Sequence, residues 1–388
     1  MGTISKSRAL SAEEIKSFGE ELDALRKETM ATIGKKEADY IYRVRNLVRY
    51  TEIAGRSSLM LGWLPPFWLA GASLLGVSKI IENMELGHNV IHGQYDWMND
   101  PSLRGSNYEW DHASTSASWR HSHNYLHHTY TNVVGRDRDV GYTVLRLTDE
   151  QPWKPYHLVQ PLTAAALAVN FQWGISLYDL ELDNVANGTK SFAKLGEDLK
   201  PFVAKVIRQS AKDHVFFPVL AGPSFLPVLT GNIAANTIRD LWTFGIIFCG
   251  HFTEDAEMFA DNIENETRGE WYLRQLRGSG NLVGSRTFEF MTGHLSRQIE
   301  HHMFPDIPAL RYPEMAVKVQ EICARYGQHY NTGTFTKQFS TVVQRIFKYS
   351  LPTRHSVEAV ASKVVTKVAD IVPMPKTRRQ SLMSLIAA

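Results

Sequence analysis

The sequence predicts an all-α integral membrane protein, with four transmembrane helices in two hairpins and a cytosolic helical cap that carries a histidine-rich di-iron site. Three observations support this fold class. Apolar residues are concentrated near 55–86 and 214–252, and a helix of about 20 residues is long enough to cross a bilayer. The rest of the chain is polar, and its histidines occur in short clusters, the densest of which lies in Trp119–Asn132. Because imidazole is the commonest nitrogen ligand of transition metals, these clusters indicate a metal site.

Composition restricts the functional classes. The chain has 388 residues, 44% hydrophobic and 21% charged, so a membrane part must be confined to a few stretches. The formal net charge of +2 and the lack of a basic stripe interleaved with aromatic residues argue against nucleic-acid binding. Cys249 and Cys323 are too few and too distant for a disulfide framework or a thiolate site, which favours a reducing cytoplasmic environment and a metal held without sulfur.

Both ends of the chain are expected to lie outside the main domain, which spans 47–345. Residues 1–46 are polar, with a helical pattern over Ala12–Ile33 and no secretory signal, and are assigned to the cytosol. Residues 346–388 are predicted to be a peripheral or disordered tail. Arginines just before the first apolar stretch favour a cytoplasmic N-terminus, and they are Arg43, Arg45, Arg49 and Arg56.

Each apolar region is predicted to form a helical hairpin. In the first, adjacent prolines end a short helix at a turn over Leu64–Pro66, and a second helix continues to His92. In the second, His214–Thr230 and Ala234–His251 are joined by a turn at Gly231-Asn232.

The apolar segment Leu158–Tyr178 is predicted to be interfacial or re-entrant. If it crossed the membrane, three crossings would separate the histidines at 121–128 from those near 300 and place them on opposite faces. A shared metal site forbids this arrangement, and Gln160, Asn170 and Gln172 within the segment agree with an interfacial position. The alternative is a genuine fifth span, with the two histidine groups unrelated.

Four histidine clusters are candidates for metal ligation. Histidines spaced i, i+4 lie on one face of a helix, and this spacing relates His88 to His92 and His123 to His127. His128 points about a quarter-turn further round the helix than His127. His121 is either a rival of His123 as ligand or a residue that orients a ligand through a hydrogen bond.

Two further clusters lie nearer the C-terminus. Gln298, His301 and His302 have the spacing i, i+3, i+4, and the glutamine is either an oxygen donor or a holder of bound water. His294 precedes Gln298 by one turn and is a ligand, an orienting residue or a cap. His251 ends the last apolar helix, on the same predicted membrane face as the other clusters.

The number of imidazoles predicts two metals. Six to nine imidazoles exceed the four ligands of a closed zinc site, and a shared dimetal centre in a membrane chain points to oxygen chemistry with iron. Carboxylates near the clusters either fix imidazole tautomers or are solvated and capping groups, and they are Glu85, Asp137, Asp139 and Glu254.

The order His-x3-His, His-x3-His-His, Gln-x2-His-His resembles that of the membrane fatty acid desaturases. The resemblance covers about residues 45–330 and is carried by Gly87–Trp97, His123–Asn132 and Gln298–Pro308, which are similar to the bacterial NADPH-dependent stearoyl-CoA (acyl-CoA) 9-desaturases. By motif position it implies the ligand role for seven histidines, which are His88, His92, His123, His127, His128, His301 and His302.

One further ligand and two departures follow from the animal acyl-CoA branch of that family. His251 resembles the extra histidine found there after the last membrane helix. Gln298 stands where that branch has a histidine, and three rather than two residues precede His127-His128. These departures leave the coordination of one iron open.

The resemblance implies two iron ions, O2 as oxidant, and a cis double bond introduced into stearoyl- or palmitoyl-CoA at carbon 9, with the acyl chain in a narrow apolar tunnel below the metals. It places the protein in the inner (cytoplasmic) membrane with the active site facing the cytoplasm. No His-Pro-Gly-Gly haem motif is present. Electrons are therefore expected from a separate donor fed by NADPH, an iron–sulfur flavoprotein reductase or a ferredoxin.

Two other functions are compatible with a histidine scaffold. A membrane di-iron hydroxylase of alkyl or lipid substrates differs in forming an alcohol rather than an alkene. A histidine-rich membrane metal-binding or transport protein has no redox role, but transporters usually place their ligands at mid-membrane on broken helices, whereas these clusters are predicted beside the membrane.

Overall fold

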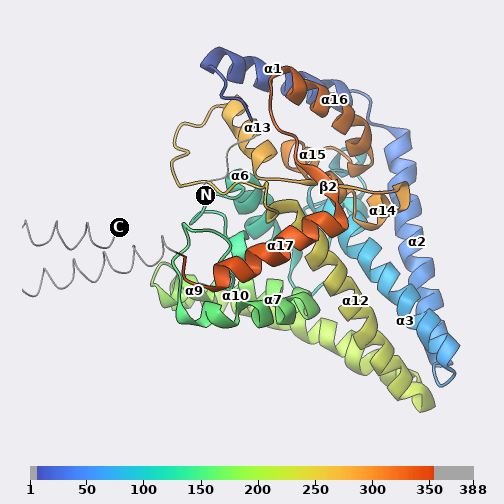
Figure 1. Ribbon diagram of the computed structural model, residues 1–388. Coiled ribbons are helices and arrows are strands. Elements are labelled where there is room, and N and C mark those ends of the chain that lie inside the picture. Colours follow the sequence, from blue (N-terminus) through green and yellow to red (C-terminus); the bar gives the residue numbers. More distant parts are fainter. Residues whose placement is uncertain (1–6, 354–388) are drawn as a thin grey trace, which may run out of the picture.

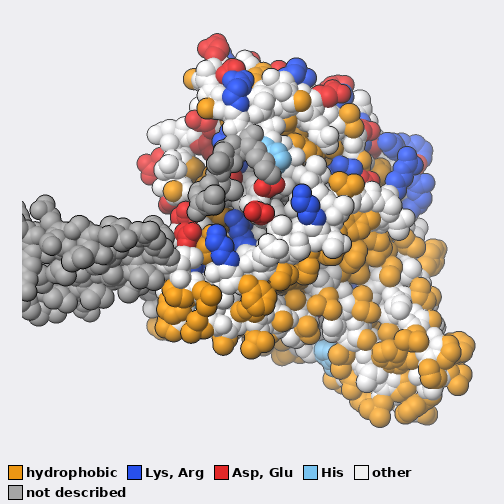
Figure 2. Space-filling view, in the orientation of Figure 1, with side chains coloured by type: hydrophobic (Ala, Val, Ile, Leu, Met, Phe, Trp, Pro, Cys, Tyr) orange, Lys and Arg blue, Asp and Glu red, His pale blue; other side chains and the backbone are white. Residues whose placement is uncertain are grey.

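The computed structural model describes residues 7–353, and its architecture is almost entirely helical (Figure 1). Two long hairpins extend towards one end of the molecule, and shorter helices form a cap at the other. Hydrophobic side chains cover the surface of the hairpin end, whereas charged side chains gather over the cap (Figure 2). The prediction of a helical fold is confirmed. The part of the predicted tail beyond residue 353 lies outside the described residues.

The first hairpin begins well before its apolar stretch. It consists, with its continuation, of α2 (Lys35–Met60), α3 (Pro65–Ile80), the π-helical turn η1 (Ile81–His88) and α4 (Asn89–Ile91). The two prolines are the first residues of α3, where a backbone N–H has no partner within the helix, so their lack of an N–H costs nothing. The chain therefore turns just before them, as predicted. The first helix is 26 residues long rather than short. A Cβ on Gly55 would lie 2.8 Å from Leu75 N, so only glycine permits this close contact between α2 and α3.

The second hairpin reverses at a different place from the one predicted. Its elements are α10 (Phe192–Ser210), η7 (Ala211–Phe216), α11 (Phe217–Leu220), η8 (Gly222–Ser224) and α12 (Phe225–His251). The chain turns at Gly222, which has a φ of +54°, and the expected turn at Gly231-Asn232 is wrong because α12 runs through both residues. A Cβ on Gly231 would lie 2.3 Å from Leu59 Cδ2, and Asn232 Nδ2 donates to Asp213 O at 2.6 Å. Gly231 and Asn232 therefore pack α12 against α2 and η7.

The segment between the hairpins is broken into short helices, which are η6 (Pro155–Val159), α7 (Gln160–Val169), α8 (Phe171–Tyr178) and α9 (Leu182–Ala186). Asn170, with φ −122° and ψ 36°, separates α7 from α8. At 1.5 Å per residue α7 is about 15 Å long, roughly half the thickness of a bilayer core. Its side of the membrane stays a prediction.

Within residues 7–353, no helix combines the length and the apolar character needed to cross a membrane.

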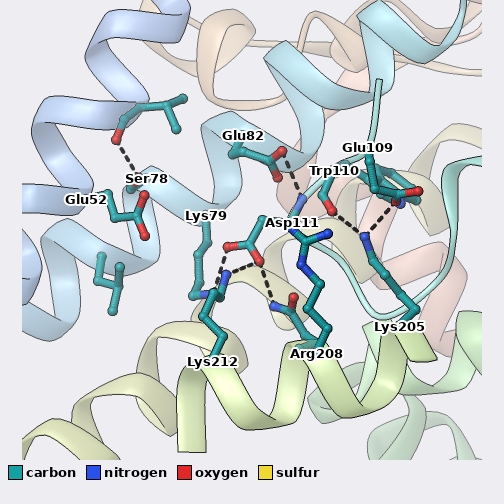
Figure 3. A pocket seen from close by; sticks show the side chains of 13 residues that line it. Glu52, Ser78, Lys79, Glu82, Glu109, Trp110, Asp111, Lys205, Arg208 and Lys212 are labelled. Atoms are coloured by element: carbon teal, nitrogen blue, oxygen red, sulfur yellow. Dashed lines mark hydrogen bonds and ion pairs between the residues drawn. The ribbon is translucent and has the colours of Figure 1, made fainter. Parts of the chain in front are cut away.

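Buried ion pairs hold the two hairpins together. Lys79 of α3 lies 2.8 Å from Asp213 of η7 and 3.2 Å from Asp111. Lys205 of α10 lies 2.6 Å from the exposed Glu109. Lys79, Asp111, Lys205 and Glu109 line a polar cavity of about 270 Å³ (Figure 3). Removing one partner of a buried pair leaves an uncompensated charge, which costs about 3–5 kcal/mol. The buried Lys79–Asp213 pair therefore fixes the spacing of the hairpins.

The cap is formed by the N-terminal helix and the C-terminal third of the described chain. Its helices are α1 (Ala12–Met30), α13 (Arg268–Arg277), α14 (Arg286–Met291), α15 (Gln298–Met303), α16 (Tyr312–Arg325) and α17 (Phe335–Ser350), and its strands β1 (Asn281–Val283) and β2 (Thr332–Thr334) pair in parallel. A capping box of Ser11 and Glu14 opens α1, as expected for the predicted helix. Phe18 and Leu22 of α1 are fully buried in one core with α13 and α16.

Short elements complete the cap and link it to the hairpins. They are η2 (Asp96–Met98), η3 (Pro101–Leu103), α5 (Ser116–Trp119), the π-helical turn η4 (Arg120–His127), α6 (His128–Tyr130), η5 (Val140–Thr143), η9 (Leu295–Arg297) and η10 (Ala309–Arg311).

We expect Gly269→Ala to loosen the contact between α1 and α13 within the cap. A Cβ at Gly269 would lie 2.1 Å from Ile15 O, so the helices must separate. Overpacking of this kind costs about 1–3 kcal/mol, and the thermal midpoint of the detergent-solubilised protein should fall by several degrees. Gly196→Ala is the matched control, because a Cβ there meets nothing within 4 Å. Equal midpoints for the two variants would contradict the close contact.

Candidate metal centre

The structure brings together all eight histidines expected to be ligands, between the hairpins and the cap. They come from the ends of η1–α4 and η4–α6, from the end of α12 and from α15, which are far apart in the sequence. Their ring nitrogens form overlapping groups whose members lie within 4.8 Å of one another. The eight residues are His88, His92, His123, His127, His128, His251, His301 and His302.

The first two histidine clusters begin on π-helical turns rather than on the regular α-helix assumed from their spacing, while His92 follows α4 and His128 begins α6. η1 ends at His88 and η4 ends at His127. The ring centroids of His88 and His92 are 4.5 Å apart, and those of His123 and His127 are 5.0 Å apart. The paired rings therefore lie together as expected, and π-helical turns occur frequently at functional sites.

The first group of rings contains His88, His92, His123 and His301. The Nε2 atoms of His88 and His123 are 3.4 Å apart. The Nε2 atoms of His92 and His301 are buried and have no hydrogen-bond partner. Four ring nitrogens thus converge on one space, where two of them have no partner and the other two have only each other.

The second group contains His127, His251 and His302. His251 Nε2 lies 3.3 Å from His127 Nε2 and 3.0 Å from His302 Nε2. Gln298 Nε2 is 2.9 Å from His251 Nε2, while Gln298 Oε1 is buried without a partner. The side-chain amide of Gln298 therefore borders the second group of rings.

His128 lies between the two groups. It falls within 4.8 Å of the ring nitrogens of His301 and His302, and it stacks on His302 with a centroid distance of 4.4 Å. Both of its ring nitrogens are buried without a partner. His128 can therefore serve either group.

The ring nitrogens of this cluster would be better satisfied by bound metal ions than by contacts with one another. An unsatisfied buried polar atom costs about 1–3 kcal/mol, and the cluster contains several such nitrogens. Metal ions that accept their lone pairs remove this cost. Donors that are mostly imidazole, with no thiolate, suit iron, zinc, copper or nickel, and two groups of rings suit two ions.

In six of the eight rings, the nitrogen on the other side is held by a polar group. His127 Nδ1 lies 2.9 Å from Asp137 Oδ2, and His123 Nδ1 lies 3.3 Å from Asp139 Oδ2. Such contacts orient the ring and fix its tautomer, so the two aspartates lie where a tautomer-fixing role requires. The remaining contacts run from His302 Nδ1 to Gln275 Oε1 (3.1 Å), His251 Nδ1 to Gly278 O (3.3 Å), His88 Nδ1 to Asn89 Oδ1 (3.2 Å) and His301 Nδ1 to Tyr312 Oη (3.4 Å).

Sequence reasoning missed most of these orienting groups. Gln275 lies in α13, and the Gly278 carbonyl follows that helix, in a stretch without any histidine motif. Tyr178, whose hydroxyl donates to Asp139 Oδ1 at 2.7 Å, ends α8. Asp137 and Asp139 were predicted as orienting groups, whereas Asn89 was not, although it adjoins His88.

Burial sets the protonation of the rings. It lowers the pKa of His88 to about 4 and holds the pKa of His123 and His302 well below the usual value. Burial also opposes the proton on His127, but the charges of Asp137 and Asp139 outweigh it and raise the pKa of this histidine. Most rings are therefore neutral, as a metal ligand must be.

Other candidates lie apart from the two groups. His294 Nδ1 is 2.8 Å from Glu85 Oε2, and Tyr40 donates to the other oxygen of Glu85 at 2.6 Å, so these side chains satisfy one another. Glu254 is exposed. His121 is also exposed and stacks on Tyr125 at a centroid distance of 6.1 Å.

An apolar cavity reaches the first group of rings. His88 lines it together with Trp119, Phe171, Ile175 and Ile247. Trp119 stacks on the His123 ring, with centroids 4.2 Å apart and an interplanar angle of 20°. The cavity has a volume of only about 20 Å³, so it marks an apolar wall beside the first group of rings rather than a space for a whole hydrocarbon chain.

Comparison with known proteins adds a family. A sequence profile for the family described as fatty acid desaturase matches residues 63–334. A NADPH-dependent stearoyl-CoA 9-desaturase from Mycobacterium tuberculosis is 42% identical over 88% of this chain and 81% of the relative. An sn-1 linoleoyl-lipid 6-desaturase from a Synechocystis species is 29% identical over 68% of this chain and 75% of the relative. Human fatty acid desaturase 3 is 24% identical over 60% of this chain and 50% of the relative.

Asp137→Asn should weaken metal binding without unfolding the protein. The carboxylate holds His127 Nδ1 and also accepts Asn132 N at 2.7 Å. Losing an orienting carboxylate typically lowers metal affinity about 10–100-fold. Metal retained after dialysis against a graded chelator, measured by mass spectrometry, tests this. Asp261→Asn, which alters a surface ion pair with Arg136, is the control, and equal retention in both variants would refute the orienting role.

Proposed function

Because the chain belongs to the fatty acid desaturase family, we propose that this oxidoreductase introduces a cis double bond at carbon 9 of stearoyl- or palmitoyl-CoA. The observation that carries this proposal is the cluster of eight histidines in two groups, the first of which borders an apolar wall at His88 and Trp119. The Mycobacterium relative, named for stearoyl-CoA and carbon 9, supports the choice of substrate and position. In the overall reaction the acyl chain loses two hydrogens, and O2 takes these, two electrons and two protons to become two waters.

We propose that the two groups of rings each hold one iron ion. His88, His92, His123 and His301 would hold the first, and His127, His251 and His302 the second, with His128 and Gln298 completing the sites. Bound iron would supply the O2 activation that breaks an unactivated C–H bond. Asp137 and Asp139 keep His127 and His123 oriented, because the second ring nitrogen of each already has a fixed acceptor.

The task of the cavity residues is to position the acyl chain. Each buried methylene contributes about 0.8 kcal/mol, so a long saturated chain binds through apolar contacts alone. Phe171, Ile175 and Ile247 line the cavity opposite His88, which keeps one part of the chain beside the rings and excludes water. Trp119 lies between the chain and the His123 ring.

We propose that the hairpin end lies in a bilayer and that the cap faces the cytoplasm, with four helices crossing and Leu158–Tyr178 in the interface. Exposed apolar side chains on the hairpins support this, as Figure 2 illustrates. They include Trp63 and Phe67 near the first turn and Leu220 and Leu226 near the second. Electrons would come from a separate NADPH-fed donor, an iron–sulfur flavoprotein reductase or a ferredoxin.

Expression in a host that lacks unsaturated fatty acids, with the reductase partner supplied, tests the reaction. We expect monounsaturated 16- and 18-carbon products with the double bond at carbon 9, mapped by mass spectrometry of derivatised lipids. His127→Ala should abolish the product while the protein remains in the membrane fraction. Saturated lipids alone would refute desaturation, and an alcohol at the same carbon would identify a hydroxylase.

Ile247→Phe should shorten the preferred substrate. The larger ring fills part of the apolar cavity, so the product ratio should shift at least severalfold from 18 to 16 carbons or below, while metal content stays the same. Leu241→Phe, on an exposed face of α12, is the matched control. An unchanged chain-length profile for Ile247→Phe would show that the acyl chain lies elsewhere.

A further inference from the structure

One of the eight ligand candidates is reachable from outside. His92 is partly exposed, whereas the other seven are buried. Gly93, which follows it, is also partly exposed and turns the chain with a φ of +76°. The edge of the first group of rings therefore comes to the surface at the end of α4.

An electron donor has to come close to the metal centre, because the rate of electron transfer falls steeply with distance. A protein donor that stays outside the fold can approach the rings most closely at an exposed ligand. Among the described residues that form the two groups, only His92 meets this requirement.

The surface around His92 is built from three separate segments, and every segment is tied to the backbone at 91–94. Arg104 precedes Gly105, which packs so tightly on Gly93 that a Cβ would lie 3.1 Å from Gly93 N. Arg120 donates to Gly105 O at 3.0 Å. We name the surface formed by Trp97, Arg104, Arg120, His121 and Tyr125 around His92 the His92 face.

Trp97 is anchored to the same backbone directly, and Tyr125 is placed by its neighbour Asn124. Trp97 Nε1 donates to Gln94 O at 3.1 Å, and the Trp97 ring is 39% exposed. Tyr125, which is 56% exposed, follows Asn124, whose Nδ2 donates to Ile91 O at 2.9 Å. Exposed tryptophan, tyrosine and arginine are the residues enriched at the centre of protein interfaces.

The charges of the His92 face select the kind of partner. Arg104 is exposed and Arg120 is half-buried, with hydrogen bonds to Gly105 O and Ser116 Oγ. The nearby carboxylate of Asp96 is exposed and accepts Gly105 N at 2.6 Å, so one negative charge stands beside the two arginines. Arginine beside exposed aromatic rings favours a partner with an acidic, partly apolar face.

We propose, on the premise of the proposed function, that the His92 face is the docking site of a small acidic iron–sulfur protein that reduces the metal centre. Each docking event moves one electron from the reduced cluster of the donor to the centre. Two donor molecules are oxidised for each double bond formed. His121, which shares a densely histidine-rich stretch with three ligand candidates but lies outside both groups, belongs to this surface through its stack on Tyr125.

The test uses the full-length enzyme in detergent, with a purified acidic [2Fe–2S] ferredoxin, reduced by NADPH and its reductase, as the probe. Arg104→Glu and Tyr125→Ala should each raise the KM for ferredoxin about tenfold and leave kcat at saturating ferredoxin little changed. Matched controls are Lys318→Glu on the cap and Tyr50→Ala on α2, both exposed, which should leave the KM as it is. Equal KM values for the His92-face variants and their controls would overturn the assignment.

A second measurement separates docking from desaturation. A photo-crosslinking amino acid at position 125 should capture ferredoxin, whereas the same group at position 50 should not, and this result needs no product. Dithionite, which requires no docking, should rescue single-turnover product formation in Arg104→Glu. If dithionite gives no alkene in the unchanged enzyme, the proposed function fails while crosslinking still decides the docking site. Ferredoxin captured equally at both positions would refute the site.

Discussion

A buried neutral imidazole that binds a metal points one ring nitrogen at the ion, and an acceptor at the other nitrogen fixes the orientation and tautomer of the ring. In the present cluster this arrangement has to be built several times, because the ligand candidates come from four separate segments. The acceptors for His127 and His302 lie in the turn at Asp137 and in α13 at Gln275. The metal centre therefore depends on cap and hairpins being assembled, and neither part forms it alone.

Asn132 illustrates how this assembly is fixed. It is fully buried with a φ of +58°, which is unusual for a residue other than glycine. Its Nδ2 donates to the carbonyls of His251, Glu257 and Gly278 at 3.3, 2.9 and 2.8 Å. Its backbone N donates to Asp137, the acceptor of His127. Asn132 thus joins the end of α12, the end of α13 and the turn that orients His127. These hydrogen bonds also maintain its unusual backbone conformation.

The sequence predicted the metal cluster far better than the path of the chain around it. Histidine spacing is local, so His88, His92 and the later histidines that the structure brings together could be singled out without knowledge of the fold. Gly231 was taken for a turn residue because glycine is common in turns, but here it provides room for Leu59 between helices. Gln275 and Asn132 had no motif, since their roles arise only when distant segments meet. The π-helical turns were missed for a similar reason, because no local spacing distinguishes them from α-helix.

The two groups of rings are held in different surroundings. The first borders the apolar cavity through His88 and the surface through His92, and Trp119 covers one of its rings. The second is enclosed, with carboxylate, amide and backbone acceptors behind His127, His302 and His251. A centre that must meet both a hydrocarbon and a reductant needs access on two sides, yet open access admits water. Because the first group has both the apolar wall and the partly exposed ring, the second group can remain sealed.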